Sequence, residues 1–291
     1  MALFQAPTKD SGKAPSKAPL LESGGYPARL VRLIDLGKQP GSGQYPDPSY
    51  KLLATFELLD EYMKETNEAG EIVMVQDPDG EPGEMIGKDL LDKPRWFDYE
   101  FTYNPDGFMG DRSHIYKFIS AIDGFEVKPD PANNIAGHPA KQLNEMLGEP
   151  LNVTLVSYTK KSGKNAGQLA NKISGFTSMK TKEKREARAL VNPTIFFDLG
   201  NPDIEVFSKL PGGDHEFAIK NRILNNLEFN GSKLQLALGQ TPTQAPVENK
   251  ASEEQVDEAM KAELEAQAKA KAEREAAAAA SGGDAPTDLP F

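Results

Sequence analysis

The chain of 291 residues contains no cysteine, one tryptophan and three histidines. The absence of cysteine excludes disulfides and thiolate metal sites and is compatible with a reducing compartment. No apolar run approaches the roughly 20 residues that a membrane span needs, and the N-terminus lacks the apolar core of a signal peptide. We therefore expect a soluble intracellular protein that does not associate with a membrane.

Acidic and basic residues are separated along the chain, whose formal net charge is -11. Residues 241–291 contain eleven Asp or Glu and five Lys or Arg, and residues 59–111 contain fifteen and four. Residues 157–188 reverse the balance, with nine basic residues and two acidic ones. Charges act on a phosphate within about a Debye length, roughly 8 Å at physiological salt. The basic stretch can therefore bind nucleic acid on a protein of negative net charge.

Alternating apolar residues predict a mainly β protein with added helices, an α+β fold. The alternation in 96–103 places the rings at 97, 99, 101 and 103 on one face, which we expect in the core. Two further runs flank a tip rich in Gly and Lys and predict a hairpin. The expected strands are 27–36, 50–60, 96–103, 151–158 and 168–176, and the expected helices are 113–122, 140–147 and 214–227.

Composition divides the chain into three parts. Residues 1–25 are rich in Lys, Pro, Ser and Gly and predict a disordered arm. Residues 26–239 predict the globular domain, interrupted by an acidic insertion at 61–94. Residues 240–291 predict a low-complexity helical spacer that ends in an acidic tip.

The search for catalytic motifs gives no match. Gly163-Lys164 lacks the upstream Gly and the following Ser or Thr of a phosphate loop. Asp77-Pro78-Asp79-Gly80 begins like a calcium loop, but Pro82 and Lys88 stand where Gly and Glu are required. The histidines have no metal-site spacing. We predict a protein that is not an enzyme and holds no metal or cofactor, while its many carboxylates leave an enzyme acting on DNA as an alternative.

Cationic and aromatic residues are interleaved on the expected strands, which is typical of proteins that bind single-stranded nucleic acid. Trp96, Tyr158 and Phe176 are the candidate rings for base stacking, with a place in the core as the alternative for Trp96 and Phe176. A solvated turn is the alternative for the hairpin lysines. The candidates for phosphate contact are Arg29, Arg32, Lys51, Lys160, Lys161, Lys164, Lys172 and Lys180.

The last four residues predict a peptide that binds a partner protein. The α-carboxylate and Asp288 can pair with Arg or Lys, Phe291 can fill an apolar pocket, and Pro290 limits the entropy lost on binding. Together with Leu289 they resemble the acidic tip of bacterial and bacteriophage single-stranded DNA-binding proteins. Only Asp284 and Asp288 are acidic among residues 281–291, so the dense acidic run of such tips is missing.

Four further motifs, in order and spacing, resemble a family of bacteriophage single-stranded DNA-binding proteins over about residues 26–230. They are Tyr26-Pro27-Ala28-Arg29-Leu30-Val31, Asp35-Leu36-Gly37, Phe56-Glu57-Leu58 and Lys93-Pro94-Arg95-Trp96. The resemblance implies an oligonucleotide/oligosaccharide-binding fold (OB-fold), a five-stranded Greek-key barrel.

The same resemblance implies a function. The protein would coat single-stranded DNA during phage replication or recombination, in the cytoplasm of an infected bacterium. Its tail would recruit phage or host replication and recombination proteins. The sequence leaves open whether the protein forms oligomers. The alternative is a phage structural or scaffolding protein without DNA binding, which the Ala- and Glu-rich segment 252–280 and the acidic total charge also fit.

Overall fold

The computed structural model describes residues 16–43, 45–161 and 165–242. Strands predominate over helices, so the protein is mainly β with added helices, as the sequence predicts. Residues 243–291 lie outside the described residues. The predicted spacer from 243 onward and the tip Asp288, Leu289, Pro290 and Phe291 therefore lie outside them as well.

A seven-stranded sheet forms the body. Its five long strands follow the order β6-β3-β2-β10-β11, each antiparallel to the next. Two short strands pair with this set: β1 is antiparallel to β3, and β12 is parallel to β2. The strands are β1 (Ser16–Lys17), β2 (Gly24–Gln39), β3 (Ser49–Glu65), β6 (Asp89–Tyr103), β10 (Pro150–Thr159), β11 (Leu169–Thr177) and β12 (Ile195–Phe197).

Aromatic rings connect the two edge strands β6 and β11, between which the described residues form no ladder. The ring of Phe176 on β11 lies 5.2 Å from Tyr99 and 5.5 Å from Phe101, both on β6. Phe118 of helix α1 (His114–Ser120) stacks on Phe101 at 4.9 Å. These rings fill the main core with Phe56 of β3. Phe176, a candidate for base stacking, is only 8% exposed and belongs to this core instead, because its neighbours cover it.

The segment before β2 also joins the edge strands. Arg95 of β6 donates from Nη1 to the carbonyl of Pro19 at 2.6 Å. Asn171 of β11 exchanges two hydrogen bonds with the backbone of Leu21, at 2.8 and 2.9 Å. Leu21 is buried in the main core. Residues 16–25 are thus part of the body rather than of a disordered arm, because their backbone finds partners on β6 and β11.

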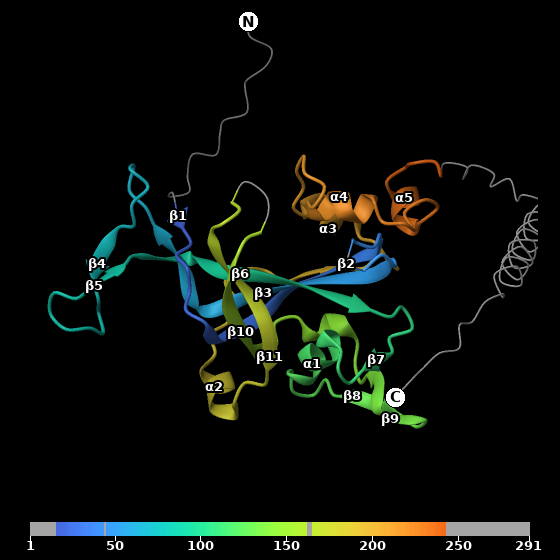
Figure 1. The fold of residues 1–291 in the computed structure, drawn as a ribbon, viewed down its shortest axis with the longest axis horizontal. Helices are drawn as coiled ribbons and strands as arrows, with labels where there is room; N and C mark the ends of the chain where they lie inside the picture. Colours follow the sequence, from blue (N-terminus) through green and yellow to red (C-terminus); the bar gives the residue numbers. More distant parts are fainter. Residues whose placement is uncertain (1–15, 44, 162–164, 243–291) are drawn as a thin grey trace, which may run out of the picture. The chain divides into compact units, whose positions relative to one another are not determined.

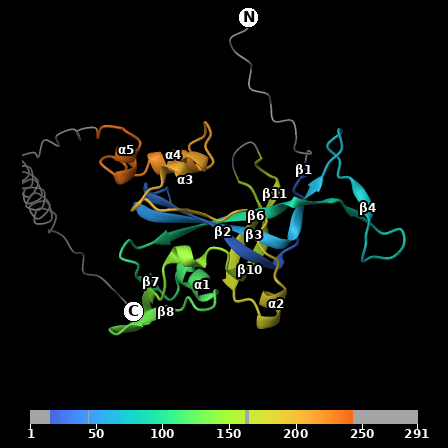
Figure 2. The same cartoon turned by 180° about the vertical axis from the view of Figure 1, so that it is seen from behind.

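Helical segments cover the sheet on both sides (Figures 1 and 2). On one side lie α1 and a small sheet, and on the other α3 to α5 bury Ile34, Leu36 and Leu53 in a second core. The remaining elements are β7 (Met109–Gly110), β8 (Val127–Asp130), β9 (Asn133–Pro139), η1 (Leu143–Met146), α2 (Thr181–Glu186), α3 (Ile204–Lys209), α4 (Ile219–Leu224) and α5 (Lys233–Ala237).

The helices differ in length from the sequence prediction. Helix α1 is capped by Ser113 and matches the expected 113–122 closely. The expected helix at 140–147 is a single 3-10 turn, and that at 214–227 is reduced to α4 with Ala218 as its N-cap. Such short helices depend on tertiary packing, which periodicity does not encode. Within the part of the chain that the structure describes, no helix is both long and apolar enough to cross a membrane.

The acidic insertion at 61–94 is largely a ribbon. Strands β3 and β6 run on past the core, paired at Tyr62 with Pro94 and at Lys64 with Asp89. Beyond them the chain forms the short hairpin of β4 (Met74–Gln76) and β5 (Met85–Gly87). In Figure 1 this teal hairpin projects away from the sheet.

Candidate nucleic-acid interface

The outer face of the β10–β11 hairpin carries an exposed ring beside a cation. The register pairs Tyr158 with Ala170 and Val156 with Lys172, so Tyr158 and Lys172 are diagonal neighbours on one face. Lys172 Nζ lies 5.2 Å from the centre of the Tyr158 ring, and Tyr158 is 37% exposed. A ring in this position offers a surface on which a base can stack.

Two further lysines follow Tyr158 in the sequence. Lys160 and Lys161 follow β10 directly, and Lys161 and Lys172 are exposed. None of these three lysines forms an ion pair with a described residue. The predicted contact Lys164 lies outside the described residues. We call Tyr158, Lys160, Lys161 and Lys172 the hairpin cluster.

The second half of the basic stretch is partly neutralised. In α2 and at its cap, Lys180 lies 3.9 Å from Glu183, and Lys182 lies 3.9 Å from Glu186. Lys184 pairs with Asp123. The side chain of Lys180 is 86% exposed, so its pair contributes little and the lysine stays within reach of a phosphate.

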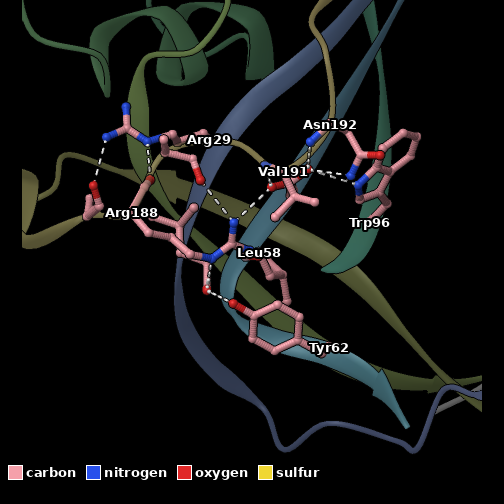
Figure 3. Close-up of polar contacts among 11 residues, drawn as sticks. Arg29, Leu58, Tyr62, Trp96, Arg188, Val191 and Asn192 are labelled. Carbon is pink, nitrogen blue, oxygen red and sulfur yellow. Dashed lines mark hydrogen bonds and ion pairs between the residues drawn. The ribbon is translucent and has the colours of Figure 1, made fainter. Parts of the chain in front are cut away.

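Arg29, a candidate for phosphate contact, is a structural residue. Its guanidinium donates to the carbonyls of Gly148 at 2.6 Å, Arg188 at 2.8 Å and Ala187 at 3.1 Å. These bonds attach the segment after α2 to β2 (Figure 3). Because the donors are used internally, the structure gives Arg29 a different role from the predicted one.

Arg32 is also engaged inside the protein. It is 6% exposed and donates to Thr55 Oγ1 at 2.8 Å and to Asp98 Oδ1 at 3.2 Å. Its guanidinium carbon lies 5.5 Å from the centre of the Trp96 ring. Arg32 therefore supports Trp96 from within, because it is buried and donates to Thr55 and Asp98 of the same protein rather than to an external phosphate.

Trp96, the single tryptophan of the chain, is 39% exposed on β6. Its Nε1 donates to Glu57 Oε2 at 3.4 Å (Figure 3). The ring is thus held at its nitrogen edge and backed by Arg32, while part of its surface stays accessible. Both properties suit a stacking platform.

Glu57 is the central polar residue of this face, and sequence reasoning missed it. Its carboxylate is fully buried and accepts from Arg188 Nη1 at 3.1 Å, from the Val191 amide at 2.8 Å and from Asn192 Nδ2 at 2.8 Å. An acidic residue inside an apolar strand indicates a buried polar contact, and this signal was present in the sequence at Glu57. Arg188, Val191 and Asn192 lie more than 130 residues away in the chain, so the sequence did not reveal that Glu57 binds them.

Arg188 completes this attachment. It donates to the carbonyls of Leu58 and Leu59, and its guanidinium carbon lies 5.1 Å from the centre of the Tyr62 ring. The segment 188–192 therefore lies firmly against β3 (Figure 3). Its position next to Trp96 makes it one border of the candidate interface.

A groove of about 910 Å³ lies between the loop after β2 and the loop before α4. Lys51 on its floor donates to Thr102 at 2.8 Å and lies 3.8 Å from Glu100, which also pairs with Arg222. Two strongly exposed rings line it, Tyr45 (72%) and Phe217 (73%). Of these residues the sequence predicted only Lys51. Tyr45 and Phe217 lie in loops, where alternation gives no signal.

A partly buried hydrogen bond joins Asp35 of β2 to Tyr103 of β6. Burial raises the pKa of Asp35, which accepts from the Gly37 amide and from Tyr103 Oη, each at 2.9 Å. Burial and this carboxylate also raise the pKa of Tyr103. Neither Asp35 nor Tyr103 lines the groove, so the pair stabilises the fold and offers no reactive group there.

The hairpin cluster, Trp96 and the groove each combine a partly accessible ring with a nearby cation. Among the described residues no group of three or more His, Asp or Glu side chains could hold a metal ion. Comparison with protein-family models, curated proteins and solved structures gave no match to this chain.

Proposed function

We propose that this protein binds single-stranded DNA without chemically altering it. The observation that carries the proposal is the hairpin cluster, where exposed Tyr158 lies beside lysines that have no acidic partner among the described residues. Phosphates can neutralise such lysines and release counterions, while the ring stacks on a base. Trp96 and the groove beside Lys51 extend the surface over which a strand can run.

The strand order supports an OB-fold for this function. Five antiparallel strands in the order β6-β3-β2-β10-β11, with α1 following β6, have the connectivity of a Greek-key barrel whose edges are β6 and β11. The rings of Phe176 and Tyr99 close the distance between those edges. OB-folds bind oligonucleotides across strands two and three and between two loops. Here these would be β3, β6, the loop beside the groove and the β10–β11 tip.

The wider biological role is an extension of this proposal. Coating of single strands in phage replication or recombination agrees with sequence-tolerant binding through phosphates and rings. Recruitment of replication proteins by Asp288 to Phe291 stays a prediction from the sequence.

Trp96 provides a direct test, because it is the only tryptophan. We expect poly-dT to quench its emission as a base stacks on the ring. Trp96→Ala should weaken poly-dT binding by about 1 to 3 kcal/mol, which is the range for a stacked base. The measurements are a fluorescence titration of the unaltered protein and an anisotropy titration of both forms.

The matched control is Phe196→Ala, which removes another exposed ring, 38% accessible on β12. We expect this variant to bind poly-dT like the unaltered protein. Constant Trp96 emission together with normal binding by Trp96→Ala would exclude this ring from the site.

A further inference from the structure

The projecting hairpin at the end of the insertion combines negative charge with exposed apolar side chains. Residues 66–87, which we call the acidic arm, contain six Asp or Glu and no Lys or Arg. Met74 and Met85 are 51% and 48% exposed. The register pairs Met74 with Gly87 and Gln76 with Met85, so both methionines lie on one face of the hairpin.

The arm stands away from the core and is held by contacts at its base and tip (Figures 1 and 2). Ion pairs at its base join Lys64 to Asp89 at 2.6 Å and Lys88 to Glu65 at 2.7 Å. At its tip the Asp77 amide donates to the Glu84 carbonyl at 2.8 Å. A two-stranded hairpin is only marginally stable alone in water. The contacts at its base and tip hold the two exposed methionines and the carboxylates in place for a partner.

The surface that complements the arm is present on the same chain. The hairpin cluster offers three lysines without an acidic partner among the described residues, together with the partly exposed ring of Tyr158. Methionine sulfur and methyl groups pack well against aromatic rings. Within one chain the described residues show no ion pair between arm and cluster. The complementary surfaces are therefore free to meet between chains.

We propose that the acidic arm binds the hairpin cluster of a second copy of this protein. The contact joins two different surfaces, so each copy can engage further copies and assemblies larger than the monomer form. The carboxylates of the arm take the places that phosphates occupy when DNA is bound. Self-association and the binding of single-stranded DNA therefore exclude each other. This competition rests on the proposed function, whereas the contact between copies does not.

Sedimentation velocity of the full-length protein tests the contact. In low salt without DNA, the average sedimentation coefficient should rise with protein concentration. Salt at about 0.5 M should reverse the rise, because it screens exposed charges. A dT oligonucleotide long enough for only one protein molecule should also reverse it, by occupying the lysines. A sedimentation coefficient that stays that of a monomer at every concentration would overturn the proposal.

Charge reversal identifies the two surfaces. The arm variant carries Glu68→Lys, Asp79→Lys and Glu81→Lys, at exposed positions whose carboxylates accept no hydrogen bond from described residues. The cluster variant carries Lys160→Glu, Lys161→Glu and Lys172→Glu. Each variant alone should stay monomeric, because each has lost one of the two complementary charges. Mixing the two should restore association, because the unaltered acidic arm of the cluster variant then meets the unaltered lysines of the arm variant. Failure of the mixture to associate would contradict the contact.

The matched control places the same charge change in the tail, as Glu253→Lys, Glu254→Lys and Asp257→Lys. This tail variant should associate like the unaltered protein. If it does not associate, the tail rather than the acidic arm makes the contact, and the proposal is wrong. The arm variant should bind poly-dT at least as tightly as the unaltered protein. If the unaltered protein does not bind poly-dT, the proposed function and the competition fail, whereas the mixing experiment still decides the contact.

Discussion

Replacing Lys160, Lys161 and Lys172 with alanine should weaken binding to poly-dT by about tenfold or more and reduce its salt dependence. Each phosphate contact with a single strand contributes about 0.7 to the slope of log affinity against log salt, so three lost contacts should lower the slope by about 2. These lysines have no acidic partner among the described residues, so their removal leaves no buried charge and little effect on folding is expected. Anisotropy titrations at several salt concentrations measure both quantities.

The matched control removes the same charge elsewhere. Lys117, Lys128 and Lys209 are exposed on α1, β8 and α3, away from the hairpin cluster. Their joint replacement by alanine should change the slope little, because only the long-range field is altered. Equal losses in the two triple variants would mean that net charge, rather than the hairpin, determines binding.

Glu57→Ala should lower the free energy of unfolding by about 3 to 5 kcal/mol, the range for breaking a buried charged pair. The substitution leaves Arg188, the Val191 amide and the Asn192 side chain without the acceptor that now binds them. It also releases the nitrogen edge of Trp96. Urea denaturation followed by circular dichroism measures the loss, and Trp96 emission in the native state reports the change around the ring.

Two substitutions calibrate this result. Glu57→Gln keeps an acceptor of the same shape and should destabilise the protein less than alanine does. Glu228→Ala removes an exposed carboxylate that accepts from Tyr50 and lies 3.7 Å from Lys38, and it should cost less than about 1 kcal/mol. A Glu57→Ala protein as stable as Glu228→Ala would contradict the role assigned to the buried carboxylate.

Local alternation made the strands and the core rings predictable. Period two in residues 96–103 places Phe97, Tyr99 and Phe101 toward the core, where the structure has them. The hairpin at 151–176 follows from its glycine-rich tip and appears as β10 and β11. In both cases the information lies within a few neighbouring residues.

The roles of several candidate site residues depend on contacts between distant parts of the chain, which the sequence pattern does not reveal. Arg29, for example, donates to the carbonyl of Gly148, which is 119 residues away in the chain. Local sequence could not show that this arginine binds a carbonyl rather than a phosphate. Phe176 and Tyr158 have similar surroundings in sequence, yet packing against Tyr99 buries only the former. The groove likewise depends on two loops that only the fold brings together.

The central claim is that this protein binds single-stranded DNA and leaves it intact. An anisotropy titration of labelled poly-dT and of a duplex of equal length, over a range of salt concentrations and with metal chelated, tests it directly. We predict binding that prefers the single strand and weakens steeply as salt increases, with the oligonucleotide recovered at full length. Absence of binding, preference for the duplex or cleavage of the oligonucleotide would contradict the claim.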